Sequence, residues 1–169
     1  DSGPLDLKRG SMGGYMTWQE VGAKLDEWRK TYPKLITART SIGKTLENRD
    51  QWIVKISDDA DIDENEPEVF VETLIHAREP AGLTSMMRCV EYLLQNYGKD
   101  PVVTDLVDNR EIWYCPVMNA DGYEYNRTIR PNGGGMWRKN RRVIGSTTYG
   151  VDLNRNWGYQ WGYDNVGSS

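Results

Sequence analysis

The only histidine of this 169-residue chain, His76, stands three positions before Glu79 in the stretch IHAREP, residues 75–80. An imidazole nitrogen and a carboxylate oxygen at this spacing can bind one metal ion. Zinc in a reactive site commonly takes three protein ligands and keeps a fourth position open for water. The pair alone is a weak signal, because a hydrogen-bonded histidine beside a glutamate at the start of a helix gives the same pattern.

The elements that must position this pair alternate between strand-like and helical patterns. Thr17 and Glu20 form the start signal of an amphipathic helix that ends before Pro33. The other expected elements are a hairpin from 35–45 and 51–57, strands at 68–76 and 111–119, a helix at 81–97, a short helix within 99–110 and an ordered segment at 150–156. This order predicts an α/β fold with a mixed, partly parallel central sheet and helices on both faces.

Candidate functional residues fall near the expected strand ends, where ligands of such sheets gather. They are His76, Asn119 and Asp152. Residues 120–149 are rich in Gly, Asn and Arg and too long for a simple connector in a compact domain. We therefore expect this stretch to be a functional loop.

Three further motifs follow the histidine: NADGYEY at 119–125, MWRKNR at 136–141 and GVDLNRNWGYQWG at 150–162. In this order and with H-x-x-E, they resemble the zinc carboxypeptidase family of the A and B type, most closely its bacterial carboxypeptidase T branch. The resemblance runs from the first helix to the last residue. It implies a secreted, zinc-dependent metallocarboxypeptidase that uses metal-activated water to release the C-terminal residue of peptides and proteins.

The resemblance also implies a role for each matched residue. His76 and Glu79 match two zinc ligands, and Asp152 matches a carboxylate that orients the ligand histidine. Arg138 matches the arginine that polarises the scissile carbonyl and stabilises the oxyanion. The substrate-binding matches are Asn154 and Arg155, which grip the C-terminal carboxylate, and Arg78, for which a surface salt bridge is an equally good explanation.

The chain departs from the family pattern in three ways. Ala120 stands where proline is usual, and Gly135 replaces a basic residue that often precedes the tryptophan–arginine pair. With His76 as the sole histidine, the third zinc ligand cannot be another histidine of this chain, and the general-base glutamate is absent too. We therefore expect residues 1–169 to be the N-terminal part of one longer catalytic domain, inactive alone. The alternative is a non-catalytic module that binds peptide C-terminal carboxylates.

An acidic stretch, SDDADIDENEPE, holds seven carboxylates between Asp58 and Glu68. A solvated acidic loop would explain it. The segment DENEPEV, however, resembles the calcium-binding loop of the carboxypeptidase T branch, and hard oxygen ligands suit that ion. The resemblance implies a structural calcium ion, with candidate ligands Asp58, Asp59, Asp63, Glu64, Glu66 and Glu68.

Composition limits the other classes of partner. The net charge is −4, which argues against general attraction to nucleic acid or anionic membranes. The one basic cluster could by itself suggest nucleic-acid binding, but the family resemblance places part of it near the substrate carboxylate; it comprises Arg127, Arg130, Arg138, Lys139, Arg141 and Arg142. No apolar run approaches the roughly 20 residues of a membrane-spanning helix. Cys89 and Cys115 are expected in a helix and a strand, where thiols are commoner than a disulfide, although the pairing stays open.

Overall fold

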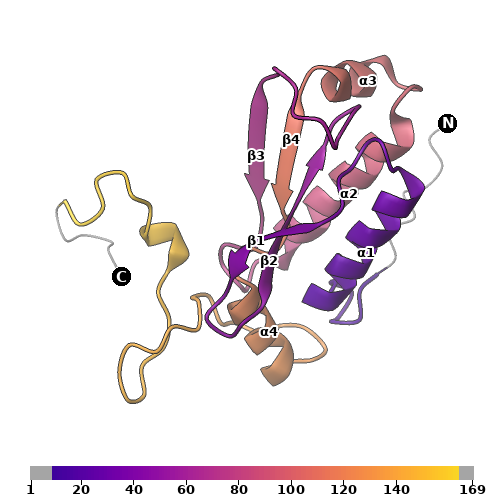
Figure 1. Ribbon diagram of the computed structural model, residues 1–169. Helices are drawn as coiled ribbons and strands as arrows, with labels where there is room; N and C mark the ends of the chain where they lie inside the picture. The colour runs from indigo at the N-terminus through magenta and orange to yellow at the C-terminus, as the bar shows by residue number, and fades with distance from the viewer. Residues whose placement is uncertain (1–8, 164–169) are drawn as a thin grey trace.

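The computed structural model describes residues 9–163, and a four-stranded mixed sheet lies at its centre (Figure 1). The strands are β1 (Thr40–Lys44), β2 (Asp50–Ile56), β3 (Glu68–Glu72) and β4 (Glu111–Cys115), in the order β1-β2-β4-β3. Strands β1 and β2 form the predicted hairpin, β2 and β4 pair antiparallel, and β3 and β4 pair parallel. The predicted mixed, partly parallel sheet is confirmed.

Within the described residues the helical segments are α1 (Trp18–Thr31), α2 (Pro80–Asn96), α3 (Pro101–Asp108), α4 (Ala120–Ile129) and the short 3₁₀ turn η1 (Leu153–Arg155). Figure 1 shows α1 and α2 alongside the sheet, with α3 near one end of the strands and α4 near the other. Alternate residues of β2 and β4, such as Val54 and Tyr114, pack with α1 and α2 in one buried apolar core. On the opposite face, Phe70 of β3 is half exposed.

Helix α1 forms where its start signal predicts. The hydroxyl of Thr17 accepts a hydrogen bond from the backbone N–H of Glu20 at 3.2 Å, and the Glu20 carboxylate accepts one from the N–H of Thr17 at 2.7 Å. This reciprocal capping box satisfies two backbone donors that the helix cannot pair internally. Val21, Leu25 and Trp28 then bury one face of the helix against the sheet.

The strand predicted at 68–76 is too long. Strand β3 ends at Glu72, because the backbone turns through Leu74, whose φ is 57°, and the N–H of Asn119 reaches back to the Leu74 carbonyl at 3.1 Å. Strand β4 likewise ends at Cys115 instead of Asn119. His76 therefore lies in the loop between β3 and α2, and Asn119 becomes the N-cap of α4.

The expectation of a loop over the whole of 120–149 is wrong for its first ten residues, which form α4. The side chain of Asn119 caps this helix by accepting the N–H of Gly122 at 3.1 Å, and Tyr123 is fully buried. Gly122 lowers helix propensity, but tertiary packing requires it, since a Cβ there would lie 2.6 Å from the carbonyl oxygen of Lys139. Helix α4 thus packs directly against the segment that carries Arg138.

Two further properties follow from the described residues. None of their helices is both long and apolar enough to cross a membrane. Cys89 lies in α2 and Cys115 in β4, as predicted, and both are free thiols. Burial raises the pKa of the Cys115 thiol to about 12.

Candidate metal centre

Residues 136–152, which we call the ribbon, carry Arg138 and Asp152 of the candidate site. The ribbon has two irregular arms, one that begins at residue 136 and one that ends at residue 152. They are joined where the N–H of Asn140 donates to the Val151 carbonyl at 3.0 Å. The ribbon is held to the His76 loop by the N–H of Ala77, which donates to the Arg138 carbonyl at 3.0 Å. Arg138 therefore sits on one arm and Asp152 on the other, both close to His76.

Asn126 of α4 fixes the same junction. Its amide nitrogen donates to the carbonyls of Ala77 and Trp137, at 3.0 and 2.8 Å, and its amide oxygen accepts the N–H of Trp137 at 2.8 Å. Asn119 adds longer amide contacts, 3.3 Å, to the Ile75 and Arg138 carbonyls. Sequence reasoning assigned no role to Asn126, and the only signal for it was its place beside the NADGYEY motif.

His76 is buried between two carboxylates. Its Nδ1 lies 3.2 Å from Oε2 of Glu79, and its Nε2 lies 3.1 Å from Oδ1 of Asp152. A neutral imidazole has a single N–H, so it can donate to only one of these oxygens. The other nitrogen then faces a carboxylate with its lone pair, and a metal ion bound by both atoms would satisfy this arrangement.

The distance between the two proposed ligand atoms tests the fit to zinc. Zinc binds histidine nitrogen and carboxylate oxygen at about 2.0–2.2 Å, so two ligands on a tetrahedral ion lie about 3.3 Å apart. Nδ1 of His76 and Oε2 of Glu79 are separated by 3.2 Å. The Glu79 side chain is 54% exposed, which leaves its side of the site open to solvent. The two residues fit a zinc ion that keeps positions for other ligands and water.

Asp152 joins the histidine to the arginine. Its Oδ2 accepts the Nε–H of Arg138 at 2.9 Å, while Oδ1 faces His76 and accepts the backbone N–H of Asn154 at 3.0 Å. Burial tends to raise the pKa of the Asp152 carboxyl, but the bonds from Arg138 and His76 outweigh burial and hold it below its usual value. Asp152 is therefore an ionised acceptor that fixes both neighbours.

The remaining site residues lie on the exposed side of this group. Asn154 and Arg155 belong to η1, which begins directly after Asp152, and both are exposed. The Asn154 side-chain oxygen accepts the indole N–H of Trp157 at 3.1 Å. Arg78 is exposed between His76 and Glu79. Hydrogen bonds thus join the side chains of His76, Glu79, Arg138 and Asp152. Arg78 is close to them only because it is a neighbour of His76 and Glu79 in the sequence.

Comparison with known proteins decides the family. The profile described as zinc carboxypeptidase matches residues 21–169. The chain belongs to the zinc carboxypeptidase family. A zinc carboxypeptidase of Saccharothrix mutabilis subsp. capreolus is 42% identical over 88% of this chain and 33% of its own length. Mouse carboxypeptidase A2 is 32% identical over 90% of this chain and 34% of its own length.

Solved structures agree with these relatives. A carboxypeptidase A from Helicoverpa armigera superposes with a TM-score of 0.75 and 32% identity, covering 91% of this chain and 36% of that chain. Thrombin-activatable fibrinolysis inhibitor superposes with a TM-score of 0.76 and 27% identity, covering 89% of this chain and 36% of that one. The family resemblance and fold expected from the sequence are confirmed, and the chain spans about a third of the length of the relatives it matches.

A second cluster of carboxylates lies on this zinc carboxypeptidase fold, away from His76. Oxygens of Asp63, Glu68 and Glu111 lie within 4.8 Å of one another. Glu68 and Glu111 are direct partners in the parallel pairing of β3 and β4. Glu111 was missed by sequence reasoning, because it lies more than forty residues from the acidic loop. The available signal was a charged residue at the start of a strand expected to be buried.

The acidic loop, residues 57–67, folds over Glu111. One Glu111 oxygen accepts the N–H of Glu64 at 3.0 Å and the ammonium group of Lys55, whereas the other is buried without a partner among the described residues. Desolvation and the neighbouring charges of Asp58, Glu66 and Asp59 raise the pKa of Glu64. Lys55 thus offsets only part of the negative charge gathered here.

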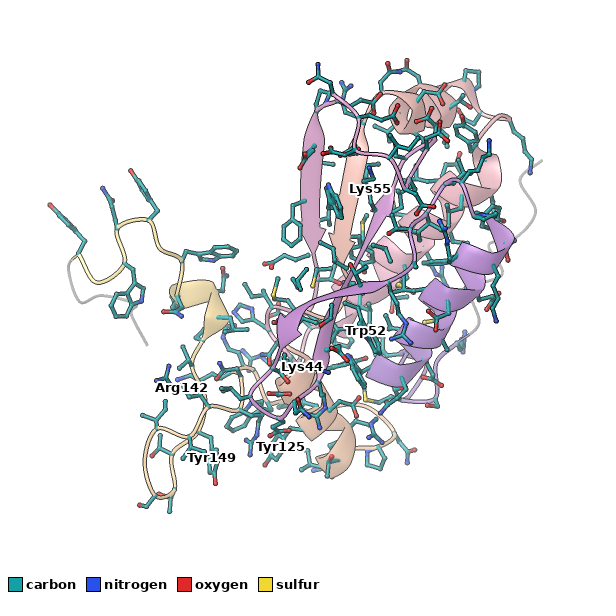
Figure 2. All side chains as sticks on the ribbon, in the orientation of Figure 1. Lys44, Trp52, Lys55, Tyr125, Arg142 and Tyr149 are labelled. Atoms are coloured by element: carbon teal, nitrogen blue, oxygen red, sulfur yellow. The ribbon has the colours of Figure 1, made fainter. Side chains whose placement is uncertain are left out.

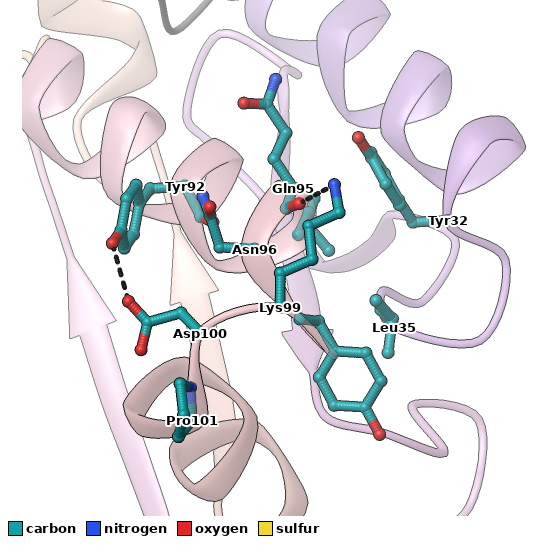
Figure 3. Close-up of a pocket in the computed structure, with 10 residues that line it drawn as sticks. Tyr32, Leu35, Tyr92, Gln95, Asn96, Lys99, Asp100 and Pro101 are labelled. Atoms are coloured by element: carbon teal, nitrogen blue, oxygen red, sulfur yellow. Dashed lines mark hydrogen bonds between the residues drawn. The ribbon is translucent and has the colours of Figure 1, made fainter. Parts of the chain in front are cut away.

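A further cavity has no residue of the candidate metal centre in its lining (Figure 3). It measures about 910 Å³ and lies where α2 meets α3, lined by Tyr32, Tyr92, Lys99 and other residues. Its polar groups largely bond within the protein, since Tyr92 donates to Asp100 and Lys99 donates to the Gln95 carbonyl. A smaller, mainly apolar pocket of about 260 Å³, lined in part by Ile75, Leu153 and Trp157, adjoins the metal centre through these residues.

Proposed function

We propose that this chain is the N-terminal part of a metallocarboxypeptidase domain that hydrolyses the C-terminal peptide bond of peptides and proteins. The observation that carries this proposal is the Asp152 carboxylate, which holds His76 through one oxygen and Arg138 through the other. The imidazole proposed to bind the metal and the guanidinium proposed to polarise the substrate carbonyl would thus act side by side. The family membership supports the same reaction.

His76 and Glu79 would hold the zinc ion, which when bound supplies an acidified water molecule and a Lewis acid. With the proton on Nε2, His76 would donate to Asp152, and the lone pair of Nδ1 would then be available to the metal. The Arg138 side chain uses Nε for Asp152, and its terminal amino groups can donate to the carbonyl oxygen as negative charge develops. These are roles in orienting and stabilising, and each depends on Asp152 being ionised.

Asn154 and Arg155 would bind the free carboxylate of the substrate. An amide and a planar guanidinium offer several N–H donors to the two carboxylate oxygens. Their exposed position on η1, directly after Asp152, puts them beside the proposed reaction centre. Arg78 would contact the peptide further from its end. Binding of the free carboxylate would restrict hydrolysis to the C-terminal peptide bond.

The rest of the site would come from a continuation of the same domain. The third zinc ligand and the general base are expected there, so residues 1–169 alone would be inactive. The described fold supports a continuation, because β3 is an edge strand whose Val69 and Phe70 are 44% and 51% exposed. Further chain packed on this edge would remove apolar surface from water.

The acidic cluster would hold a structural calcium ion. Asp63, Glu68 and Glu111 offer carboxylate oxygens close enough for one ion, and calcium prefers oxygen ligands in flexible loops. Of the candidates named from sequence, Asp63 and Glu68 belong to this group, while Asp58, Asp59, Glu64 and Glu66 would act mainly through their charge. The unpartnered oxygen of buried Glu111 supports a cation beyond Lys55.

The proposal places the protein outside the cell, as the family resemblance implies, with peptides as its partners. It gives nucleic acid and membranes no role. Among the basic cluster, Arg127 pairs with Glu124 at 2.7 Å and Arg138 with Asp152 at 2.9 Å, so part of its charge is neutralised within the protein.

Zinc content and peptidase assays on the full-length protein test the function. We expect about one zinc ion per molecule, and release of the last residue from N-blocked dipeptides with a free carboxylate but not from their C-terminal amides. A protein that binds free-carboxylate peptides without hydrolysing them, in the presence of zinc, would establish the non-catalytic module instead.

A further inference from the structure

The guanidinium of Arg141 is enclosed by three aromatic rings. Its central carbon lies 3.8 Å from the ring centre of Tyr125, 4.7 Å from that of Trp137 and 4.7 Å from that of Tyr149. The side chain is 13% exposed, and its Nε lies 3.7 Å from a carboxylate oxygen of Glu47. Stacking on aromatic faces is therefore its main interaction, supplemented by an ion pair too long for a hydrogen bond.

The three rings belong to three separate parts of the structure. Trp137 lies on the first arm of the ribbon. Tyr125 lies on α4 and Tyr149 on the second arm (Figure 2). Trp137 also packs edge-on against Tyr125, with ring centres 5.2 Å apart. Arg141 thus ties both arms of the ribbon to each other and to the helix beneath them.

The two arms carry the residues that the proposed reaction needs. Trp137 immediately precedes Arg138, and Tyr149 stands three residues before Asp152. Between the arms, the Asn140 side chain accepts the N–H groups of Arg142 and Val151, at 3.1 and 2.8 Å. A shift of one arm relative to the other would alter the 2.9 Å contact between Arg138 and Asp152.

We propose that Arg141 is a positioning residue that sets the geometry of Arg138 and Asp152 through this aromatic enclosure. The inference rests on the proposed function, since it assigns a role within that site. Arg141 touches no reacting atom in this account. An arginine suits the position because its flat, permanently charged group can contact several ring faces, which the compact ammonium of lysine cannot do equally well.

The first test uses the full-length, zinc-loaded protein with Arg141→Lys, and with Arg142→Lys as the matched control. Arg142 is exposed and is the next residue on the ribbon. We expect Arg141→Lys to lower kcat by about 10-fold with little change in KM, because misplacement of Arg138 weakens the transition state. Arg142→Lys should leave both constants unchanged. Wild-type kcat in Arg141→Lys would overturn the proposal.

A double-mutant cycle separates positioning from general stability. In an Arg138→Ala background, Arg141→Lys should change kcat by less than about 2-fold, because the residue through which it acts is gone. An undiminished 10-fold loss in that background would show that Arg141 does not act through Arg138. If Arg141→Lys fails to fold, Tyr149→Leu removes one wall of the enclosure and provides the same cycle.

Zinc affinity gives a readout that does not require peptidase activity. Asp152 orients His76, so Arg141→Lys should weaken zinc binding several-fold in competition with a chelator, and should lose this effect in an Asp152→Asn background. A wild-type protein that binds zinc but hydrolyses no peptide would refute the proposed function, and the zinc cycle would still decide the role of Arg141. Equal zinc affinity for wild type and Arg141→Lys would refute the positioning role.

Discussion

The Nε–H of Arg138 donates to Oδ2 of Asp152 over 2.9 Å, and this leaves the other carboxylate oxygen to His76. The cation proposed to polarise the substrate and the imidazole proposed to bind zinc are therefore oriented by one side chain. A substitution of Asp152 should therefore disturb both Arg138 and His76, whereas a substitution of Arg138 should leave zinc binding unchanged.

Asp152→Asn is expected to weaken zinc binding by about 10- to 100-fold, because the amide cannot hold both neighbours as the ionised carboxylate does. The measurement is chelator competition on the full-length protein. Asp105→Asn, on the surface of α3, provides the control and should bind zinc like wild type. Wild-type affinity in Asp152→Asn would remove the carboxylate from the account of the metal centre.

Arg138→Ala is expected to lower kcat by about 10²- to 10³-fold, the usual loss when one donor to a developing oxyanion is removed. Zinc content should stay near that of the wild type, since Arg138 is not a proposed ligand. Steady-state kinetics and metal analysis on the same preparation check both parts. Lys139→Ala is the neighbouring control. A rise in KM with unchanged kcat would assign Arg138 to substrate binding instead.

Arg155→Gln is expected to raise KM for peptides with a free C-terminus by about 10- to 100-fold, because charged hydrogen bonds to the substrate are lost. The variant should also discriminate less between a free carboxylate and a C-terminal amide. Comparing kcat/KM for the two kinds of peptide measures this directly. Arg130→Gln, another cation of the basic cluster, is the control. If Arg155→Gln keeps the wild-type preference for a free carboxylate over an amide, then other residues bind the substrate carboxylate.

The sequence predicts well those elements whose signals are local. The capping box of Thr17 and Glu20 forms where it was expected, and so does the hairpin, although β1 covers only Thr40–Lys44 of the predicted 35–45. The sequence does not predict α4, because Gly122 and Asn126 have low helix propensity. Both residues are needed there for contacts with distant parts of the chain. Such contacts join residues far apart in the chain and leave no periodic signal.

The candidate site shows the same division. His76, Glu79, Arg138 and Asp152 could be named from motifs, and the structure brings their side chains together. The aromatic enclosure of Arg141 could not be named, because the sequence shows only a basic cluster with aromatic neighbours. Glu111 was missed for a similar reason, since only strand pairing places it beside Glu68.

Glu20 should give α1 a pH-dependent stability. Although burial tends to raise its pKa, N–H groups of Thr17 and Ser11 bind its carboxylate and lower the pKa overall. A lowered folded-state pKa means that the stabilisation is present above the unfolded pKa, about 4.3, and is lost as pH falls through the folded value. Glu20→Gln should therefore cost up to about 1 kcal/mol at pH 7 and less at pH 3.

Urea unfolding of the full-length protein at the two pH values measures this difference. Glu27→Gln changes a carboxylate of the same helix that is 64% exposed and pairs with Lys24 on the surface. It should alter stability much less than Glu20→Gln at pH 7. A cost for Glu20→Gln that is equal at pH 7 and pH 3 would show that ionisation of the carboxylate contributes nothing to the cap.

Calcium should stabilise the protein through the acidic cluster. A ligand that binds only the folded state at 100 times its dissociation constant adds about 2.7 kcal/mol, enough to raise Tm by several degrees. Glu68→Gln should abolish this rise, because it removes one of the three clustered carboxylates. Glu68 is exposed, so the variant should keep the Tm of the calcium-free protein, unlike a change at Glu111, which would leave buried Lys55 unpaired.

Thermal unfolding with millimolar calcium, and with a calcium-selective chelator that spares zinc, provides the measurement. Asp105→Asn is again a surface control and should respond to calcium like the wild type. Magnesium at the same concentration should raise Tm less, because it demands a stricter octahedral geometry than a loop and two strands can provide. If calcium and chelator both leave the wild-type Tm unchanged, then Lys55 alone balances the cluster, and the acidic loop is a solvated surface feature.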